Sequence, residues 1–495
     1  MNNEVASILE AIKIHAKETP DKLCAGDKKK SATYSEFWDM IQRAATYLKN
    51  SGVRKDSIVV IRGVQKVEYL VAALGIQLAG AAYLPLEKAV KDDRILEIMK
   101  FVEADVYVAE KPVNNENVKN ISLKELLKIV TDKTSPIETF EMPKSNQLAE
   151  ILFTTGTTGK SKGIEVTFKT DIAIAQNVID SVEMGKDEVE LLSTPINHSL
   201  AIRRFYGAMY NGSTAILTDG FVFVEDFFKL LDNYKITAIT FVPAILDMVL
   251  KFAKDRFSTY DSQFNYIQMG SAPLSEADKE LLTKMFPSVR LYNTYGATES
   301  GCTVILEFNK YADKKNCIGR TTVNTTIFFV DENRNEIEAS FKNPGYMAFK
   351  GDMNMRGYYK EPEITKEALE NGNIYTNDLG YVGDDGLVYL LGRKGDVINM
   401  GGLKIAPTEI EEVVMTYEKI KDCACIPIKD EITGEAPKLF VVMNDGCEFD
   451  RKEITKFMLN KLEAFKVPKV FEVIDEIPRT FNGKIIRKKL KELNN

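Results

Sequence analysis

The chain has 495 residues, more than a single hydrophobic core usually serves, so two or three domains are expected. Hydrophobic residues make up 44% of it and charged residues 28%, as in ordinary globular proteins, and the net charge of -7 argues against a nucleic-acid partner. The two histidines disfavour a histidine-built metal centre, and six cysteines without CxxC spacing fit a reducing, cytoplasmic location.

The N-terminal segment is predicted to be helical and not to enter a membrane. Glu4 and Glu10 stand where a signal peptide would carry a basic start and an apolar core, so an amphipathic helix is expected. Residues 69–86 are nearly free of charge and long enough to raise the question of a membrane span. Gln77 and Pro85 interrupt the stretch, which favours a buried helix followed by a short strand. No integral membrane segment is therefore expected.

Short β-branched runs alternate with helical patterns along most of the chain. Alternation of this kind predicts parallel sheets covered by helices. The runs are residues 58–61, 106–108, 151–153, 215–217 and 238–241. The polar stretch 111–149 lacks them and is predicted as a surface excursion with one short helix at 123–131.

After about Cys317 the pattern changes to closely spaced strands, such as residues 326–330 and 346–349, which predict a small antiparallel unit. The last hundred residues are predicted as a separate α+β domain with its hinge near Gly395. In that part Thr408 and Asp450 each begin a capping-box pattern, which indicates the start of a helix.

The sharpest local signal is a loop rich in glycine, threonine and lysine directly after an apolar strand. Residues 153–163 read Phe-Thr-Thr-Gly-Thr-Thr-Gly-Lys-Ser-Lys-Gly, and their amides, hydroxyls and lysines can surround phosphate oxygens. A Walker A loop would need glycine where Thr154 stands, so a P-loop NTPase is disfavoured. A solvated turn of the same composition stays an alternative. The candidate phosphate-binding residues are Thr154, Thr155, Gly156, Thr157, Thr158, Gly159 and Lys162.

This loop resembles the phosphate-binding signature of the adenylate-forming superfamily, which includes acyl- and aryl-CoA synthetases, peptide synthetase adenylation domains and firefly luciferase. The resemblance spans nearly the whole chain, because further motifs follow in the same order. It implies an α/β fold with a large N-terminal domain, made of two helix-covered mixed sheets plus a small distorted antiparallel barrel, and a small mobile α+β C-terminal domain. The ATP- and acid-binding domain would be 1–393, and 394–495 would be the mobile domain that carries the adenylation lysine.

Two further segments match the family near its acid pocket. His198, in Pro-Ile-Asn-His, matches the position where an aromatic or histidine side chain gates the pocket, although a lone histidine is more often a core residue. Gly270 and Ala272, in Gly-Ser-Ala-Pro-Leu, resemble the segment that lines the pocket and the adenine edge. A plain strand-to-helix turn explains this second segment about equally well.

Residues 293–299, Asn-Thr-Tyr-Gly-Ala-Thr-Glu, resemble the family's Tyr-Gly-x-Thr-Glu motif. The resemblance implies that the tyrosine stacks on adenine, Thr298 contacts the α-phosphate and Glu299 holds Mg2+, a hard cation that prefers a carboxylate. The nucleotide-binding candidates in this segment are Asn293, Tyr295 and Gly296.

Asp378 resembles the carboxylate that accepts hydrogen bonds from both ribose hydroxyls, and Arg393 matches the residue that joins it there, although either could be a surface charge. Residues 478–485 resemble the final motif, whose lysine, here Lys484, enters the site for adenylation. A cation placed between an attacking carboxylate and the α-phosphate offsets the repulsion of two anions. The alternative for this basic run is a solvated tail.

The family rotates its small domain between two half-reactions, which implies that Lys484 serves the first and the region of Gly402 lies beside pantetheine in the second. Many members carry Asp or Lys at the hinge, where this chain has Gly395. Glycine permits the rotation, but the sequence offers no polar side chain there to hold either state.

The sequence thus predicts an ATP- and Mg2+-dependent ligase that converts an aryl or short- to medium-chain acid to acyl-AMP and passes the acyl group to coenzyme A. No acidic residue follows His198 closely, which disfavours an amino-acid substrate. Arg203 and Arg204 are expected on the solvent face of a helix, with contact to a polar substituent or a second carboxylate of the substrate as the alternative. The chain ends soon after Lys484, so a fused carrier domain is not expected, and phosphopantetheine on a separate acyl carrier protein is the alternative acceptor. A kinase-like or regulatory nucleotide-binding protein, and luciferase-type oxidation, are remoter alternatives.

Overall fold

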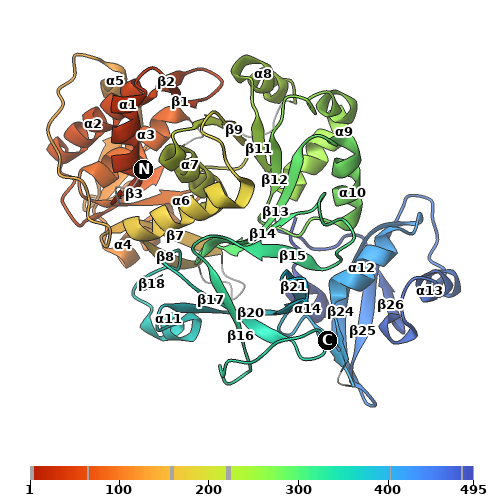
Figure 1. Cartoon of the computed structure of the whole chain (residues 1–495). Helices are drawn as coiled ribbons and strands as arrows, with labels where there is room; N and C mark the ends of the chain where they lie inside the picture. Colours follow the sequence, from red (N-terminus) through yellow and green to blue (C-terminus); the bar gives the residue numbers. More distant parts are fainter. Residues whose placement is uncertain are drawn as a thin grey trace.

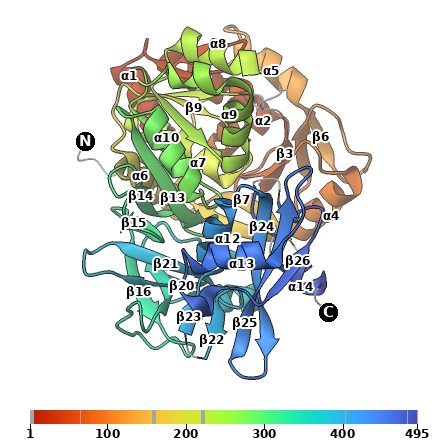
Figure 2. The same cartoon turned by 90° about the vertical axis from the view of Figure 1, so that its right-hand side faces the viewer.

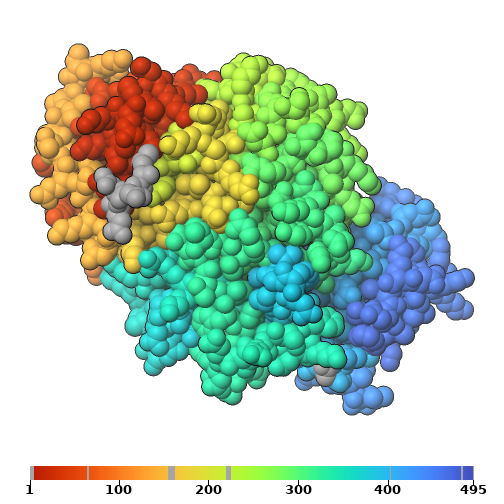
Figure 3. Space-filling model, in the orientation of Figure 1, coloured from red at the N-terminus to blue at the C-terminus, as the bar shows by residue number. Residues whose placement is uncertain are grey.

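The computed structural model describes residues 5–63, 66–155, 161–218, 224–401, 403–480 and 483–493. Within them the chain forms three sheets, of 14, seven and five strands, with helices packed between and around them (Figure 1). The five-stranded sheet belongs to the C-terminal segment, which forms a small lobe against one side of the larger part (Figure 3).

The largest sheet joins a parallel half to an antiparallel half. Its strand order is β16-β17-β20-β21-β15-β14-β13-β12-β11-β9-β10-β1-β2. The parallel half contains β1 (Leu23–Gly26), β10 (Thr214–Leu217), β9 (Val189–Leu192), β11 (Ala238–Phe241), β12 (Tyr266–Met269) and β13 (Arg290–Ala297), with β2 (Ser31–Thr33) antiparallel at the edge. The antiparallel half contains β14 (Gly301–Glu307), β15 (Cys317–Thr321), β21 (Val388–Arg393), β20 (Asn373–Val382), β17 (Gly345–Lys350) and β16 (Thr326–Val330), with β19 (Leu369–Glu370) beside β20. The antiparallel unit predicted after Cys317 is therefore present, and β14 and β15 connect it to the parallel half.

The second sheet is mixed and brings distant segments together at one edge. Its members in spatial order are β18 (Gly357–Tyr358), β8 (Ser161–Thr167), β7 (Leu148–Thr155), β4 (Ala82–Leu86), β3 (Ile58–Arg62), β5 (Val106–Ala109) and β6 (Lys119–Ser122). The short β18 pairs with β8 although nearly two hundred residues separate them in sequence. That pairing ties the antiparallel unit to the hairpin formed by β7 and β8.

Helices fill the space between the two large sheets and cover their outer faces. The buried cluster between the sheets is built from α1 (Ile8–Glu18), α2 (Tyr34–Asn50), α3 (Val67–Leu78), α6 (Phe168–Val182) and α7 (Ser199–Asn211). The helix α5 (Leu123–Thr131) adds three residues to the same cluster, and outside it lie α4 (Asp92–Val102), α8 (Val224–Tyr234), α9 (Pro243–Ser258), α10 (Glu276–Met285) and α11 (Pro362–Ala368). Burial of a large apolar area in these layers supplies most of the driving force for folding.

The apolar stretch of residues 69–86 forms a buried helix and strand, as predicted. Every residue of α3 is buried, and β4 follows it with five buried residues. In the described residues no helix has both the length and the hydrophobicity that a bilayer crossing requires. The amphipathic N-terminal helix is also present as α1, which buries Ile8 and Ile12.

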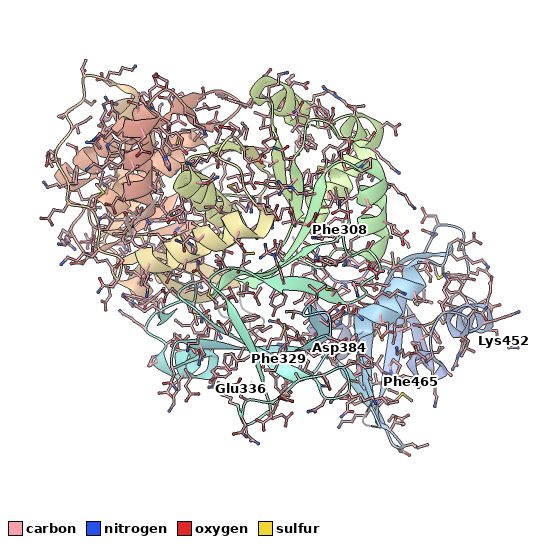
Figure 4. All side chains as sticks on the ribbon, viewed as in Figure 1. Phe308, Phe329, Glu336, Asp384, Lys452 and Phe465 are labelled. Atoms are coloured by element: carbon pink, nitrogen blue, oxygen red, sulfur yellow. The ribbon has the colours of Figure 1, made fainter. Side chains whose placement is uncertain are left out.

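The C-terminal lobe contains β22 (Ile398–Met400), β23 (Leu403–Ile405), β24 (Ile420–Asp430), β25 (Gly434–Met443), β26 (Val470–Val473), α12 (Pro407–Met415), α13 (Arg451–Leu459) and α14 (Arg487–Leu493). Asp450 caps α13 as predicted, because its side chain accepts hydrogen bonds from the amides of Lys452 and Glu453. The start expected at Thr408 is wrong: α12 begins at Pro407, which suits the first position of a helix, and Ala406 precedes it without a side-chain cap. Figure 4 shows Lys452 of α13 at the outer rim of this lobe, far from Phe329 of β16.

All six cysteines fall within the described residues, and none forms a disulfide. Five of them are buried, and only Cys447 in the C-terminal lobe is partly exposed.

Candidate active site

Several predicted site residues follow the ends of neighbouring strands in the largest sheet. His198 comes after β9, Gly270 and Ala272 come after β12, and Asn293 lies within β13. Carboxyl ends of parallel strands meet at one edge of a sheet, where α/β proteins commonly bind ligands. The small lobe lies in front of the region where the parallel half, the antiparallel half and the second sheet meet (Figure 2).

Asp378, Arg393 and Tyr295 form one hydrogen-bonded group. Asp378 lies opposite Arg393 in the antiparallel pairing of β20 with β21, and Arg393 Nε donates to Asp378 Oδ1 at 3.1 Å. The Tyr295 hydroxyl donates to Asp378 Oδ2 at 2.5 Å. Burial, and then the neighbouring Asp378 carboxylate, raise the pKa of Tyr295 well above its usual value, so the phenol keeps its proton and remains a donor.

Glu299 is held by a segment from another part of the chain. The Tyr358 hydroxyl donates to Glu299 Oε1 at 2.9 Å, and the Met355 amide donates to the Glu299 carbonyl at 2.7 Å. Lys162 Nζ lies 4.9 Å from the centre of the Tyr358 ring. The structure therefore brings the predicted metal carboxylate to the hydroxyl and the predicted phosphate lysine to the ring of one tyrosine.

The turn that carries Thr298 and Glu299 requires glycine at its start. A Cβ atom on Gly296 would lie 1.9 Å from the Gly301 carbonyl oxygen, so no other residue fits there without moving the turn. Thr298 Oγ1 lies 3.2 Å from Ser199 Oγ at the start of α7.

His198 occupies the N-cap position of α7, and its Nε2 lies 3.4 Å from Glu87 Oε1. Burial lowers the pKa of His198 below its ordinary value, although the Glu87 charge opposes the shift. The ring is therefore neutral at pH 7 and can both donate and accept a hydrogen bond. The other histidine, His15, is buried near the Tyr210 carbonyl and belongs to the core.

Asn293 carries a buried acceptor. Its Oδ1 atom is buried and has no hydrogen-bond partner among the described residues. Buried carbonyl oxygens are rarely left unpaired, so this atom could accept a hydrogen bond from a bound molecule. The side-chain amide of Gln268 donates to Thr294 Oγ1 at 2.6 Å. A Cβ atom added to Gly270 would lie 3.3 Å from the Leu200 side chain.

Lys484 comes to this site from the C-terminal lobe. The Thr480 amide donates to the Lys484 carbonyl at 2.8 Å and its hydroxyl accepts from the Lys484 amide at 3.1 Å, which closes a tight turn. Desolvation, and then the positive charge of Arg393, lower the pKa of Lys484, while Asp378 and Glu299 act in the opposite direction. The amine thus lies within electrostatic range of three predicted site residues, while its side chain stays accessible to solvent.

Part of the predicted phosphate loop lies outside the described residues. The predicted site residues outside the description are Gly156, Thr157, Thr158 and Gly159 of the loop, together with Gly402 in the C-terminal lobe. The side chains of Thr154 and Thr155 are also outside it. The backbones that flank the loop are described: Thr154 pairs with Lys162 across β7 and β8.

The expectation that Arg203 and Arg204 face solvent is wrong, because both are buried. Arg203 Nη1 contacts Glu150 Oε1 at 2.7 Å and also pairs with Asp171, while Arg204 Nε contacts Glu190 Oε1 at 2.7 Å. These carboxylates come from the strands and helix that α7 packs against. Paired charge of this kind is how a buried arginine is tolerated.

Three site contacts were not anticipated from the sequence: Tyr358 on Glu299, Glu87 on His198 and Ser199 on Thr298. Each joins residues that are about sixty to one hundred and ten positions apart in the chain, so no local spacing could reveal it.

Two family models match the chain. The AMP-binding enzyme family matches residues 12–359, and the AMP-binding enzyme C-terminal domain matches residues 409–484.

Curated relatives and solved structures extend over almost the full chain. A 4-coumarate–CoA ligase 1 of Petroselinum crispum is 27% identical over 95% of this chain and 91% of its own length. A 2-succinylbenzoate–CoA ligase of Geobacillus sp. is 25% identical over 96% of this chain and 95% of its own. The o-succinylbenzoate CoA synthetase of Bacillus subtilis, solved with its acyl-adenylate intermediate, superposes with a TM-score of 0.83 at 22% identity, covering 97% of each chain. ATP-bound MatB from Rhodopseudomonas palustris gives a TM-score of 0.86 at 22% identity, covering 99% of this chain and 98% of that one. At this identity the superpositions establish the fold, a large N-terminal and a small C-terminal unit.

Proposed function

The chain belongs to the AMP-binding enzyme family, and on that premise we propose that it is an acid–thiol ligase. It activates a carboxylic acid with ATP as acyl-AMP, releases pyrophosphate, and transfers the acyl group to the thiol of coenzyme A. The observation that carries the proposal is the position of Lys484, within electrostatic range of Asp378, Arg393 and Glu299 although it comes from the other end of the chain.

This arrangement suits the first half-reaction. A carboxylate oxygen attacks the α-phosphorus of ATP, the bond to pyrophosphate breaks, and negative charge accumulates where two anions meet. The Lys484 ammonium offsets that charge, and Arg393 adds a second cation nearby. We assign Asp378 to the ribose hydroxyls, Tyr295 to the adenine face and Asn293 to the adenine edge.

In the second half-reaction a thiolate attacks the carbonyl carbon of acyl-AMP, AMP leaves, and the thiol proton passes to solvent. AMP is a far better leaving group than the oxide that a free carboxylate would have to expel. We propose that residues 394–495 rotate relative to 1–393 between the steps, which would bring the region of Gly402 beside the pantetheine arm.

The donor set fits Mg2+ better than a metal held by protein alone. In the described residues no group of three or more His, Cys, Asp or Glu side chains could hold a metal. Glu299 is a single carboxylate, and Mg2+ typically takes one or two carboxylates and completes its shell with phosphate oxygens and water. Bound there, the ion would neutralise phosphate charge during the displacement.

For the acid we propose an aromatic or short- to medium-chain carboxylate. The named substrates of two relatives, 4-coumarate and 2-succinylbenzoate, are aromatic acids. Arg203 and Arg204 are paired with internal carboxylates, so they do not supply a cation for a second substrate carboxylate. We also propose a cytoplasmic location, because unpaired cysteines fit a reducing compartment.

The test is acid-dependent exchange of labelled pyrophosphate into ATP over a panel of aryl and aliphatic acids. We expect exchange with a subset of them, release of AMP and not ADP, and thioester formation with coenzyme A alone. If the thioester formed only with a holo-carrier protein, the acceptor would be that protein and not coenzyme A, and the proposed adenylation step would stand. Absence of exchange with every acid in the presence of Mg2+ would overturn the proposal.

A further inference from the structure

Residues 355–359 connect two parts of the site that the sequence keeps far apart. The Met355 amide donates to the Glu299 carbonyl at 2.7 Å, the Arg356 amide to the Glu165 carbonyl at 2.9 Å, and the Tyr359 amide to the Gly163 carbonyl at 2.7 Å. The segment thus bonds to the turn that holds the metal carboxylate and to the strand that leaves the phosphate loop. Backbone bonds on both sides leave little freedom for the residue between them.

Tyr358 is the side chain of this segment that faces both parts. Its hydroxyl donates to Glu299 Oε1 at 2.9 Å, and its ring lies 4.9 Å from Lys162 Nζ. Only 9% of the residue is exposed, so water competes poorly for either contact. A hydrogen bond from a neutral donor to a carboxylate is stronger than one between neutral groups, and an ammonium near an aromatic face is attracted by the ring quadrupole.

The two contacts act on different atoms. The hydroxyl bond fixes which Glu299 oxygen remains free, and it lowers the freedom of the carboxylate to rotate. The ring holds the Lys162 ammonium without neutralising it, because an aromatic face carries no net charge. The Lys162 amine therefore remains available to attract phosphate oxygens.

We propose that Tyr358 is a positioning residue for the Mg2+–triphosphate site: its hydroxyl orients Glu299 toward the metal and its ring directs Lys162 toward the phosphates. The inference rests on the proposed function and goes beyond it by giving a role to a side chain that touches neither substrate nor product. Partners that orient a metal ligand in this way commonly change metal affinity by about 10- to 100-fold when they are removed.

The chain offers a matched control in the next residue. The Tyr359 hydroxyl donates to the Val102 carbonyl at 3.3 Å, and its ring packs on Phe101 at 5.9 Å between ring centres, away from Glu299. Tyr358→Phe removes one hydroxyl and keeps the ring, Tyr358→Leu removes both contacts, and Tyr359→Phe removes one hydroxyl from the same segment.

Binding and turnover are both to be measured. Mn2+ titrated into the protein with a non-hydrolysable ATP analogue and followed by electron paramagnetic resonance gives metal affinity without any reaction. We expect Tyr358→Phe to weaken Mn2+ binding and to raise the half-saturating Mg2+ for pyrophosphate exchange by about tenfold, with a much smaller change in kcat at saturating Mg2+. In Tyr358→Leu we also expect a higher KM for ATP, because Lys162 loses its contact with the aromatic ring. Tyr359→Phe should match the wild type in both measurements.

The outcomes separate this inference from the proposed function. Equal Mn2+ affinity in Tyr358→Phe and Tyr359→Phe, with all proteins folded by thermal melting, overturns the role of Tyr358. So does a loss of kcat that saturating Mg2+ does not restore. Failure of the wild type itself to exchange pyrophosphate contradicts the proposed function, while the metal titration still decides the geometry around Glu299.

Discussion

Lys484 has charges of both signs around it. Partial desolvation by the surrounding protein, and then Arg393, destabilise its protonated form, while Asp378 and Glu299 stabilise it, and the net effect is a lowered pKa. A cation held under these conditions is weakly paired, so it can respond to negative charge that appears only during the reaction.

Replacing Lys484 by alanine should slow adenylation by at least about a hundredfold, the scale for losing a partner to transition-state charge. Thioester formation from supplied acyl-AMP should survive. The two half-reactions are measured separately by pyrophosphate exchange and by thiolysis of synthetic acyl-AMP. Equal losses in both would contradict the assignment of Lys484 to the first step.

The lowered pKa of Lys484 has a definite sign in a pH profile. The protonated amine is the active form, so adenylation should decline at a pH below the ordinary lysine value of 10.5. In Lys484→Arg the guanidinium keeps its proton, so residual adenylation should show no such alkaline decline. Rates of exchange between pH 7 and 10.5 test this, and an identical decline in both proteins would assign it to another group.

The sequence predicts the positions of some site residues but not the contacts of others. Asp378 and Arg393 were identified only through their motifs, and the register of β20 with β21 explains why they meet. Tyr358 lies in no motif that carries chemistry, and it contacts Glu299 only because β18 joins the edge of the second sheet. Arg203 and Arg204 were wrongly predicted to face solvent, because local sequence does not reveal that three carboxylates from other elements pair with them.

At the scale of elements, helices α10 and α12 approach one another across the boundary between the large part and the C-terminal lobe. Glu412 on α12 has its pKa raised to about 7 by burial and then by Glu276 on α10. Glu411 on its own helix adds to the shift, whereas Lys279 and Lys315 oppose it. The surroundings of Glu412 therefore favour its protonated carboxyl group.

This shift predicts that the small lobe docks more weakly as pH rises. The pKa of Glu412 is above its ordinary value of 4.5 in the folded chain, so its stabilising contribution is complete below pH 4.5 and is lost as pH rises through about 7. Glu412→Gln should remove that loss and raise the melting temperature at pH 8 by about 1 to 3 °C, a small effect because the group keeps partial access to solvent. Glu418→Gln, an exposed change just beyond the same helix, is the control, and equal pH profiles for both variants would refute the assignment.

Whole elements were predicted better than their contacts. Residues 123–131, 238–241 and 326–330 were expected with the bounds of α5, β11 and β16, because each is a periodic or β-branched run between polar residues. The strand β6 was missed in the polar stretch after residue 111, because only Ile121 of its four residues is buried. Its assignment depends on pairing with β5, which local sequence does not encode.

At the scale of the molecule, the two lobes meet at a short link around Gly395. Gly395 has a φ of +80°, and a Cβ atom there would touch nothing within 4 Å. On one side the Lys394 amide donates to the Asn377 carbonyl at 2.6 Å; on the other, Lys491 Nζ donates to the Gly395 carbonyl at 2.6 Å and lies 2.8 Å from Asp396 Oδ1. The polar contacts that the sequence lacks at the hinge are thus supplied from α14.

Removing this contact should shift the balance between the half-reactions. In Lys491→Met the link loses its bond to α14, and we expect adenylation to slow about threefold relative to thiolysis of acyl-AMP, as befits a partly exposed ion pair. Lys488→Met on the same helix is the control. A ratio of the two single-turnover rates that is equal in both variants would show that Lys491 does not hold the link.

The overall architecture followed from the order of motifs, whereas the orientation of the lobes did not. Strand and helix patterns specify each lobe through its own buried core, but a contact at the link, such as that of Lys491 with the Gly395 carbonyl, joins residues almost one hundred positions apart. No periodicity in the sequence reports such contacts.

The uneven exposure of the thiols has a practical consequence. Because Cys447 alone is partly exposed, a maleimide fluorophore would attach at one place on the small lobe of the native chain. Resonance energy transfer from that dye to a nucleotide bearing an acceptor would then show whether the small lobe moves relative to the bound nucleotide, without an engineered cysteine.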